Sequence, residues 1–90
     1  MTIFYTYVLH SLQFDKIYIG QTSNLKQRYA LHNKGRSNYT KKYIPWELVY
    51  HEEFPTRSRA MQREKELKSH MGRKFIREKI LPVRVRQLPD

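Results

Sequence analysis

Five side chains in this sequence are of types that can cut a phosphodiester bond. In chain order they are Tyr7, Tyr18, Arg28, His32 and Glu64. Such a cut needs an activated water, positive charge beside the pentacoordinate phosphate, help for the leaving group and a means of positioning the strand. A carboxylate, an arginine and hydroxyl or imidazole proton carriers are suited to these tasks. The set predicts a nuclease site, provided that the fold brings its members together.

Two segments near the start of the chain predict the strands that carry the tyrosines. Residues 3–9 and 16–20 are rich in β-branched and aromatic residues, and a polar stretch separates them. The pattern predicts a hairpin with Tyr7 on its first strand and Tyr18 on its second. Gly20 closes the second strand, where the missing Cβ lets a backbone, a metal or a phosphate come close. Spacing alone also allows both tyrosines to be ordinary strand residues.

A helix is predicted over residues 24–33. One face of it is formed by the positions i, i+3, i+4 and i+7, which are Leu25, Arg28, Tyr29 and His32. Arg28 and His32 are therefore expected as neighbours on the buried side. A buried arginine needs an anionic partner because an unpaired buried charge is costly, and residues 16–46 contain no acid. For His32, a packed and hydrogen-bonded histidine is the alternative to a functional one.

The acidic member of the set falls on a second predicted helix, over residues 56–71. One face of this helix carries Ala60, Glu64, Leu67 and Met71. Glu64 interrupts an otherwise apolar stripe, which makes it the better candidate for chemistry. Its neighbour Glu66 falls on another face among basic residues and is interpreted as a solvated charge. The alternative for Glu64 is a charge at the edge of the core.

The order of these motifs resembles that of the GIY-YIG nuclease domain. The residues that carry the resemblance are Tyr7, Tyr18-Ile19-Gly20, Arg28, His32 and Glu64. The resemblance covers residues from about 4 to about 80, and it is greatest to small stand-alone bacterial members. Those members are similar to the nuclease module of the excision-repair incision enzyme and to structure-specific resolvases.

The chain departs from the family pattern at two places. The first motif reads Tyr5-Thr6-Tyr7, so the glycine and isoleucine of the family name are replaced while the motif tyrosine is kept. The polar residue that the family often has after its acidic helix, commonly an asparagine, has no clear counterpart at Ser69 or His70. No role is assigned to that position here.

The resemblance implies a role for each member of the set. Glu64 would hold a divalent metal, Mg²⁺ or alternatively Mn²⁺, and one carboxylate is enough for an ion that keeps several waters. Arg28 would contact the scissile phosphate. Tyr7 would act as the general base or assist it, with His32 as its helper, because a free tyrosine hydroxyl with a pKa of about 10 is not basic enough alone. Tyr18 would orient water or phosphate.

The remaining sequence completes the predicted order ββαβαα. Residues 46–54 predict a third strand and residues 73–80 a short third helix, with Gly72 at the C-terminal end of the helix before it. The implied fold is α/β, a small three-stranded, mostly antiparallel sheet flanked by helices. Residues 1–81 would form one nuclease-like domain. Residues 82–90, which include Val83-Arg84-Val85-Arg86, would form a basic C-terminal tail.

The loop before the third strand supplies a candidate substrate-binding segment. Aromatic and basic residues alternate there, which suits contacts to a phosphate backbone or a splayed base. We assign binding to Tyr39, Thr40 and Lys41, and to Gly20 beside the tyrosines. A loop that is only packed over the sheet is the alternative.

Composition bounds the partners independently of these motifs. The 18 Lys and Arg residues outnumber the 8 Asp and Glu residues, which gives a net charge of +10 and predicts a polyanionic partner. The chain has no cysteine, no visible secretory signal and no run of apolar residues long enough to span a membrane, so a cytoplasmic location is expected. The scattered histidines lack zinc-ligand spacing, and three glycines cannot build a phosphate-cradling loop.

These observations predict a metal-dependent endonuclease that hydrolyses DNA, one strand at each active site, in repair or recombination. Two alternatives are a catalytically silent nucleic-acid-binding module with the same fold and a basic RNA-associated adaptor. The preferred nucleic-acid structure and the oligomeric state are left open.

Overall fold

The computed structural model describes residues 2–82 and confirms the predicted α/β architecture. Its elements, in chain order, are β1 (Phe4–Ser11), β2 (Lys16–Thr22), α1 (Leu25–Asn33), the 3₁₀ turn η1 (Thr40–Tyr43), β3 (Glu47–Phe54), α2 (Arg57–Lys68), α3 (His70–Phe75) and the π-helical turn η2 (Ile76–Ile80). The predicted tail segment from Val83 onward lies outside the described residues. No helix in the described range is long and apolar enough to cross a membrane.

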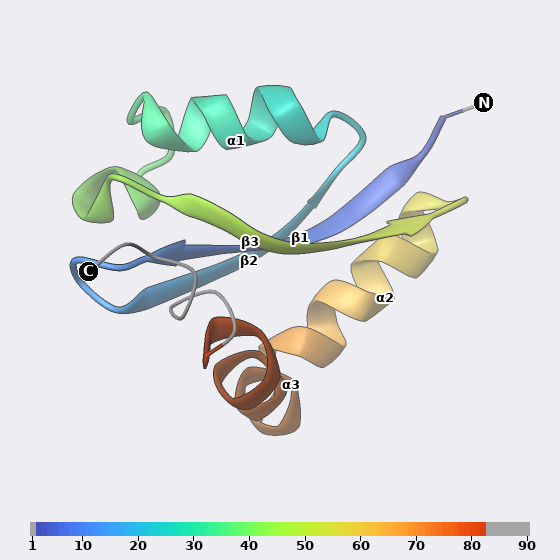
Figure 1. Cartoon of the computed structure of the whole chain (residues 1–90). Helices are drawn as coiled ribbons and strands as arrows, with labels where there is room; N and C mark the ends of the chain where they lie inside the picture. The colour runs from blue at the N-terminus through green and yellow to red at the C-terminus, as the bar shows by residue number, and fades with distance from the viewer. Residues whose placement is uncertain (1, 83–90) are drawn as a thin grey trace.

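The three strands form one antiparallel sheet with β1 in the middle. The strand order is β2-β1-β3, and β1 pairs antiparallel with both neighbours. Helix α1 covers one face of the sheet, while α2 and α3 cover the other (Figure 1). The central strand is therefore buried on both faces, which explains why six of its eight residues, Thr6 to Ser11, are buried.

Alternation along β1 divides the apolar interior into two clusters. Tyr7 and Leu9 point toward α1 and pack with Trp46. Val8 points to the opposite face and packs with Leu67 and with residues of the C-terminal turns. Each face of the sheet thus has its own core, and the candidate tyrosine belongs to the one under α1.

Helices α1 and α2 begin at the side-chain caps that the sequence offers. The Asn24 side chain accepts a hydrogen bond from the backbone N–H of Gln27 at 3.1 Å, and Thr56 does the same for Arg59 at 3.2 Å. Such caps satisfy backbone donors that have no partner within the helix. They fix where each helix starts, and therefore which way its functional side chains face.

The second helix is shorter than predicted. It ends at Lys68, and Ser69 separates it from α3. The Ser69 hydroxyl accepts a hydrogen bond from the Gly72 N–H at 3.1 Å, so this serine caps a new helix. Gly72 lies inside α3 and not at the end of α2, and Met71 is 69% exposed instead of extending the buried stripe of α2. Both sequence expectations are corrected here.

Gly72 allows α3 to cross the end of α2 at close range. A Cβ at this position would collide with the carbonyl oxygen of Glu66 and the Cα of Leu67, both of which are backbone atoms. A Gly72→Ala change should therefore lower the free energy of unfolding by about 1–3 kcal/mol, as overpacking does. Helix propensity alone would raise it by about 1 kcal/mol, so the sign of the change separates the two effects. Urea unfolding measures it.

The matched control is Met71→Ala, one residue away on the exposed side of the same helix. Its effect on the free energy of unfolding should stay within about 0.5 kcal/mol. A Gly72→Ala variant as stable as the wild type would contradict the close helix crossing.

Candidate active site

A chain of two buried hydrogen bonds lies at the centre of the site. The Tyr7 hydroxyl is 3.0 Å from His32 Nε2, and His32 Nδ1 is 2.9 Å from the Thr40 hydroxyl. Tyr7, His32 and Thr40 have exposed fractions of 1%, 2% and 0%. The three residues come from β1, α1 and η1, so the bonds join three different elements of the fold.

Gly20 makes room for the Tyr7 hydroxyl. The two residues are paired in the register of β1 and β2. A Cβ on Gly20 would lie 2.6 Å from the Tyr7 hydroxyl oxygen and 2.8 Å from its ring carbon Cζ. The space that the sequence suggested for a phosphate or a metal is thus occupied by Tyr7 itself. Glycine is needed here because any side chain would push the hydroxyl away from His32.

Tyr18 is the half-buried aromatic member of the set. Its ring centroid lies 4.7 Å from that of His32 and 6.3 Å from that of Tyr7. The hairpin register pairs Tyr18 with Leu9, two residues along β1 from Tyr7, which puts both tyrosines on the face covered by α1. The predicted hairpin therefore brings Tyr7 and Tyr18 together with His32.

Arg28 is exposed, contrary to the expectation of a buried guanidinium. Helix α1 is nine residues long, and only His32 on it is fully buried. Leu25 and Tyr29 are half-buried, so the apolar stripe is narrower than the sequence pattern indicated and Arg28 falls outside it. An exposed arginine needs no buried acid beside it. Burial raises the pKa of Tyr7 and lowers that of His32. The positive charge of Arg28 opposes the first shift and adds to the second, so Arg28 is within electrostatic reach of the site.

Glu64 lies on α2, at the edge of the apolar cluster that contains Val8 and Leu67. It follows the buried Ala60 by one helical turn, and its side chain is 23% exposed, whereas Glu66 is 53% exposed. The carboxylate accepts a hydrogen bond from Lys68 Nζ at 2.7 Å, one turn further along α2. Its negative charge raises the pKa of Tyr7, so Glu64 and Arg28 both act on the same hydroxyl.

Burial keeps the two central groups neutral. It is the largest cause of the rise in the pKa of Tyr7, with a smaller contribution from Tyr18. Burial is also the main reason why the pKa of His32 falls below its ordinary value. At neutral pH the pair is therefore a tyrosine hydroxyl beside an uncharged imidazole, and that imidazole can donate from one nitrogen and accept at the other.

Thr40 holds the His32 ring at Nδ1, on the side away from Tyr7. Its hydroxyl is buried and bonds His32, whereas Tyr39 and Lys41 on either side are exposed. The Thr40 carbonyl accepts a hydrogen bond from the Trp46 indole N–H at 2.7 Å. Asn33 in turn bonds both backbone groups of Trp46, at 3.0 and 2.6 Å. Sequence reasoning missed these positioning contacts because they join a helix end to a loop and follow no periodic pattern.

Among the five candidate residues, Glu64 supplies the one carboxylate that a metal ion could bind. No group of three or more His, Asp or Glu side chains in the described part of the chain could form a protein-only cage. The chemistry of Glu64 fits Mg²⁺ or Mn²⁺, which bind oxygen and commonly take one or two carboxylates with waters and substrate phosphate. The competing ion pair with Lys68 is a surface i, i+4 pair worth about 0.3–0.5 kcal/mol, too little to block a metal.

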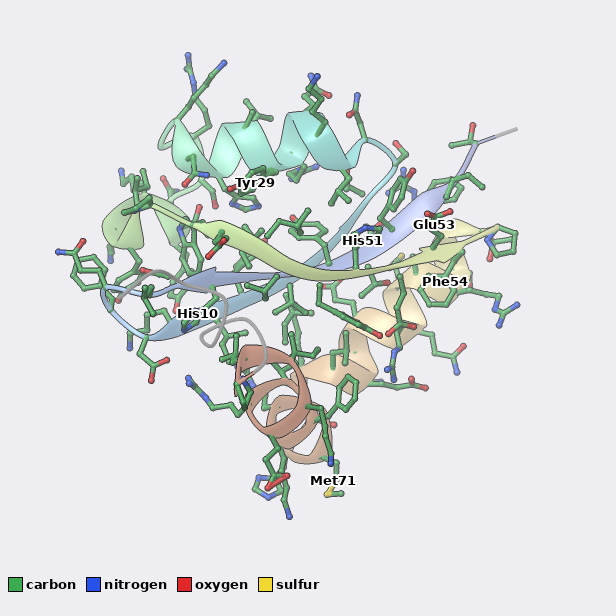
Figure 2. All side chains as sticks on the ribbon, in the orientation of Figure 1. His10, Tyr29, His51, Glu53, Phe54 and Met71 are labelled. Carbon is green, nitrogen blue, oxygen red and sulfur yellow. The ribbon has the colours of Figure 1, made fainter. Side chains whose placement is uncertain are left out.

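One hollow in the described structure lies away from these residues. A groove of about 570 Å³ is bordered by Tyr5, Lys26, Tyr29, His51 and Glu53, among others, and includes none of the five candidate residues. Figure 2 shows Tyr29 on the side of α1 that faces the sheet, and His51 and Glu53 on β3. The hydrogen bonds and charges around Tyr7, and not the volume of a pocket, therefore locate the candidate site.

The three-stranded sheet with its helices, and the contacts among Tyr7, Tyr18 and His32, are those expected of a small nuclease-type domain. The family model described as the GIY-YIG catalytic domain matches residues 3–77, and the chain belongs to that family. This result confirms the resemblance drawn from the motif order.

The chain is also similar to proteins designated UPF0213. It is 46% identical over 66 residues to one from Natronomonas pharaonis, covering 72% of this chain and 76% of the relative. It is 41% identical to one from Staphylococcus haemolyticus, covering 72% and 79%. The NMR structure of a UPF0213 protein from Bacillus halodurans matches with a TM-score of 0.50 and 28% identity, covering 82% of this chain and 81% of the other. The Bacillus halodurans protein shares the fold of this chain.

The depressed pKa of His32 predicts a pH dependence of stability. In the unfolded chain this histidine takes up a proton near pH 6.5, whereas in the fold it does so only at lower pH. The unfolded state therefore binds more protons in that window, and stability is lost as the pH falls from above 6.5 through the folded pKa. Urea unfolding at about pH 7.5 and about pH 5.5 should show a smaller loss in His32→Gln than in the wild type.

The control is His70→Gln, which removes an exposed histidine from α3. It should lose as much stability between the two pH values as the wild type does. Equal losses in the wild type and in His32→Gln would show that His32 takes up its proton equally readily in the folded and unfolded chain.

Proposed function

We propose that this protein is a metal-dependent endonuclease that hydrolyses DNA phosphodiester bonds, cutting one strand at each active site. The observation that carries the proposal is the convergence on one hydroxyl. Tyr7 is hydrogen-bonded to His32, and the charges of both Arg28 and Glu64 act on it. The net charge of +10 supports a polyanionic substrate. Family membership supports nuclease chemistry.

The accessible members of the set would contact the substrate. Arg28 is exposed, and its planar guanidinium suits the non-bridging oxygens of the scissile phosphate. Glu64 would hold Mg²⁺ or Mn²⁺, and the ion would polarise the phosphate and lower the pKa of a bound water. The guanidinium of Arg28 and a cation held by Glu64 would together offset the negative charge that develops on the phosphate in the transition state.

The buried members would handle the proton. A free tyrosinate is disfavoured here because burial raises the pKa of Tyr7. His32 is uncharged and hydrogen-bonded to that hydroxyl, so Tyr7 can pass its proton to Nε2 as it receives one from the attacking water. Thr40 would hold the imidazole in place from the other side. The general base in this proposal is the Tyr7–His32 pair acting together.

A binding module without turnover is the rival function. It would keep the basic surface, but it has no use for a carboxylate at the edge of the site, because a negative charge repels phosphate. Glu64 therefore favours the enzyme. A role in DNA repair or recombination and a cytoplasmic location are proposals that rest on the resemblance and the composition.

Glu64→Gln should abolish cleavage while nucleic-acid binding persists. The change keeps the side-chain shape but removes the charge that would hold the metal, so the rate should fall by about 100-fold or more. The assay is cleavage of end-labelled duplex, single-stranded and branched DNA, with an RNA strand for comparison, in Mg²⁺ or Mn²⁺. The matched control is Glu66→Gln, two residues along α2, which should cut within about twofold of the wild type.

Two outcomes would reject the enzyme. One is a folded wild-type protein that binds the panel and cuts nothing with either metal, which would favour the binding module. The other is a Glu64→Gln variant that cuts at the wild-type rate.

Lys68→Ala should lower the metal concentration needed for half-maximal cleavage. Lys68 competes with the ion for the Glu64 carboxylate, and a pair of this kind is worth about 0.5 kcal/mol, so the shift should be about twofold. Lys65→Ala is the control because it removes the same charge from an exposed site on the same helix. Equal metal requirements in both variants would contradict the competition.

A further inference from the structure

Four aromatic rings continue outward from the candidate site along the protein surface. The ring centroids of Tyr18 and Tyr39 are 6.4 Å apart with an interplanar angle of 29°. Tyr39 lies 5.3 Å from Tyr43, and Tyr43 lies 5.5 Å from Phe14. We call Tyr18, Tyr39, Tyr43 and Phe14 the aromatic track. Its members come from β2, from the η1 region and from the turn between β1 and β2.

The outer rings of the track are half exposed. Tyr39 has 46% of its surface exposed and Phe14 has 44%, although both are large aromatic residues. Tyr18, at the inner end, lies against His32 in the candidate site. A ligand that covers the exposed rings would therefore extend directly to the reacting groups.

The charges around the aromatic track suit an anionic chain. Lys16 Nζ lies 5.5 Å from the centre of the Tyr43 ring, and Lys41 and Lys42 are exposed on η1. The acid beside the track, Asp15, is paired with Arg77 at 2.8 Å, which offsets its charge. Interleaved aromatic rings and basic side chains are the pattern by which proteins bind single-stranded nucleic acid.

We propose that the aromatic track stacks with unpaired bases of the strand that is cut, so the preferred substrate has a single-stranded segment beside the scissile bond. Bases within a duplex are stacked on one another and offer no free face to a protein ring. Every unpaired base has such a face, so the preference would be for strand structure and would tolerate many sequences. This inference rests on the proposed nuclease function.

Binding to a catalytically silenced protein tests the aromatic track apart from turnover. In a Glu64→Gln background, calorimetry would compare a single-stranded DNA of about 12 nucleotides, a duplex of the same length and an abasic strand that keeps only sugars and phosphates. The silenced protein should prefer the single strand to both. Tyr39→Ala and Phe14→Ala should each weaken single-strand binding by about 5- to 150-fold. Neither should change binding of the abasic strand.

Two further variants separate stacking from general damage. Tyr39→Phe keeps the ring and should bind like the wild type. Met71→Ala removes a large exposed side chain that points away from the sheet on the side opposite α1, and it should also have no effect (Figure 2). Thermal unfolding by circular dichroism confirms that each variant is folded.

The proposal is overturned if folded Tyr39→Ala and Phe14→Ala bind the single strand as tightly as their parent. It is also overturned if they weaken the abasic strand equally, because the loss is then one of loop position and not of stacking. Cleavage by the wild-type protein is scored separately. A protein that cuts but shows no base-dependent binding would keep the proposed function and lose the aromatic track.

Discussion

The architecture of the site depends on keeping three buried polar side chains satisfied. Tyr7, His32 and Thr40 are almost inaccessible to water, and they satisfy one another in a single line of hydrogen bonds. A buried polar group that loses its partner costs about 1–3 kcal/mol, so breaking either bond would be felt across the fold. The line ties the central strand to α1 and α1 to η1. The position of η1, which Tyr39 precedes and Tyr43 ends, follows from this constraint.

The site separates its neutral groups from its charged ones according to the cost of desolvation. The neutral hydroxyl and imidazole lie inside, while the guanidinium of Arg28 and the carboxylate of Glu64 stay in contact with solvent. Had Arg28 been buried beside His32, as the helical pattern indicated, its charge would have needed a permanent partner. In the observed arrangement Arg28 is exposed to water and needs no such partner, which leaves it free for the phosphate contact of the proposed function.

The sequence allowed the element order to be predicted, and with it the strands and helices that carry the five candidate residues, because both depend on short-range patterns. Alternation marked the strands that carry Tyr7 and Tyr18, and capping residues marked the start of α1. The break at Ser69 was missed because a serine cap overrode a stripe that continued to Met71. The second hydrogen-bond partner of His32, Thr40, was also missed. Thr40 begins the short turn η1, and the tertiary contacts of Asn33 and Trp46 hold it within hydrogen-bond distance of the imidazole.

The indole that holds Thr40 gives the molecule a built-in optical probe. Trp46 is the single tryptophan of the chain, and it is 2% exposed. Its ring lies 6.4 Å from that of Tyr18 and 6.3 Å from that of Tyr43, close enough to receive excitation energy from both. The tryptophan emission of the protein therefore comes from one buried side chain between the site and the loop beside it. A ligand that moves η1 would change that emission without any attached dye.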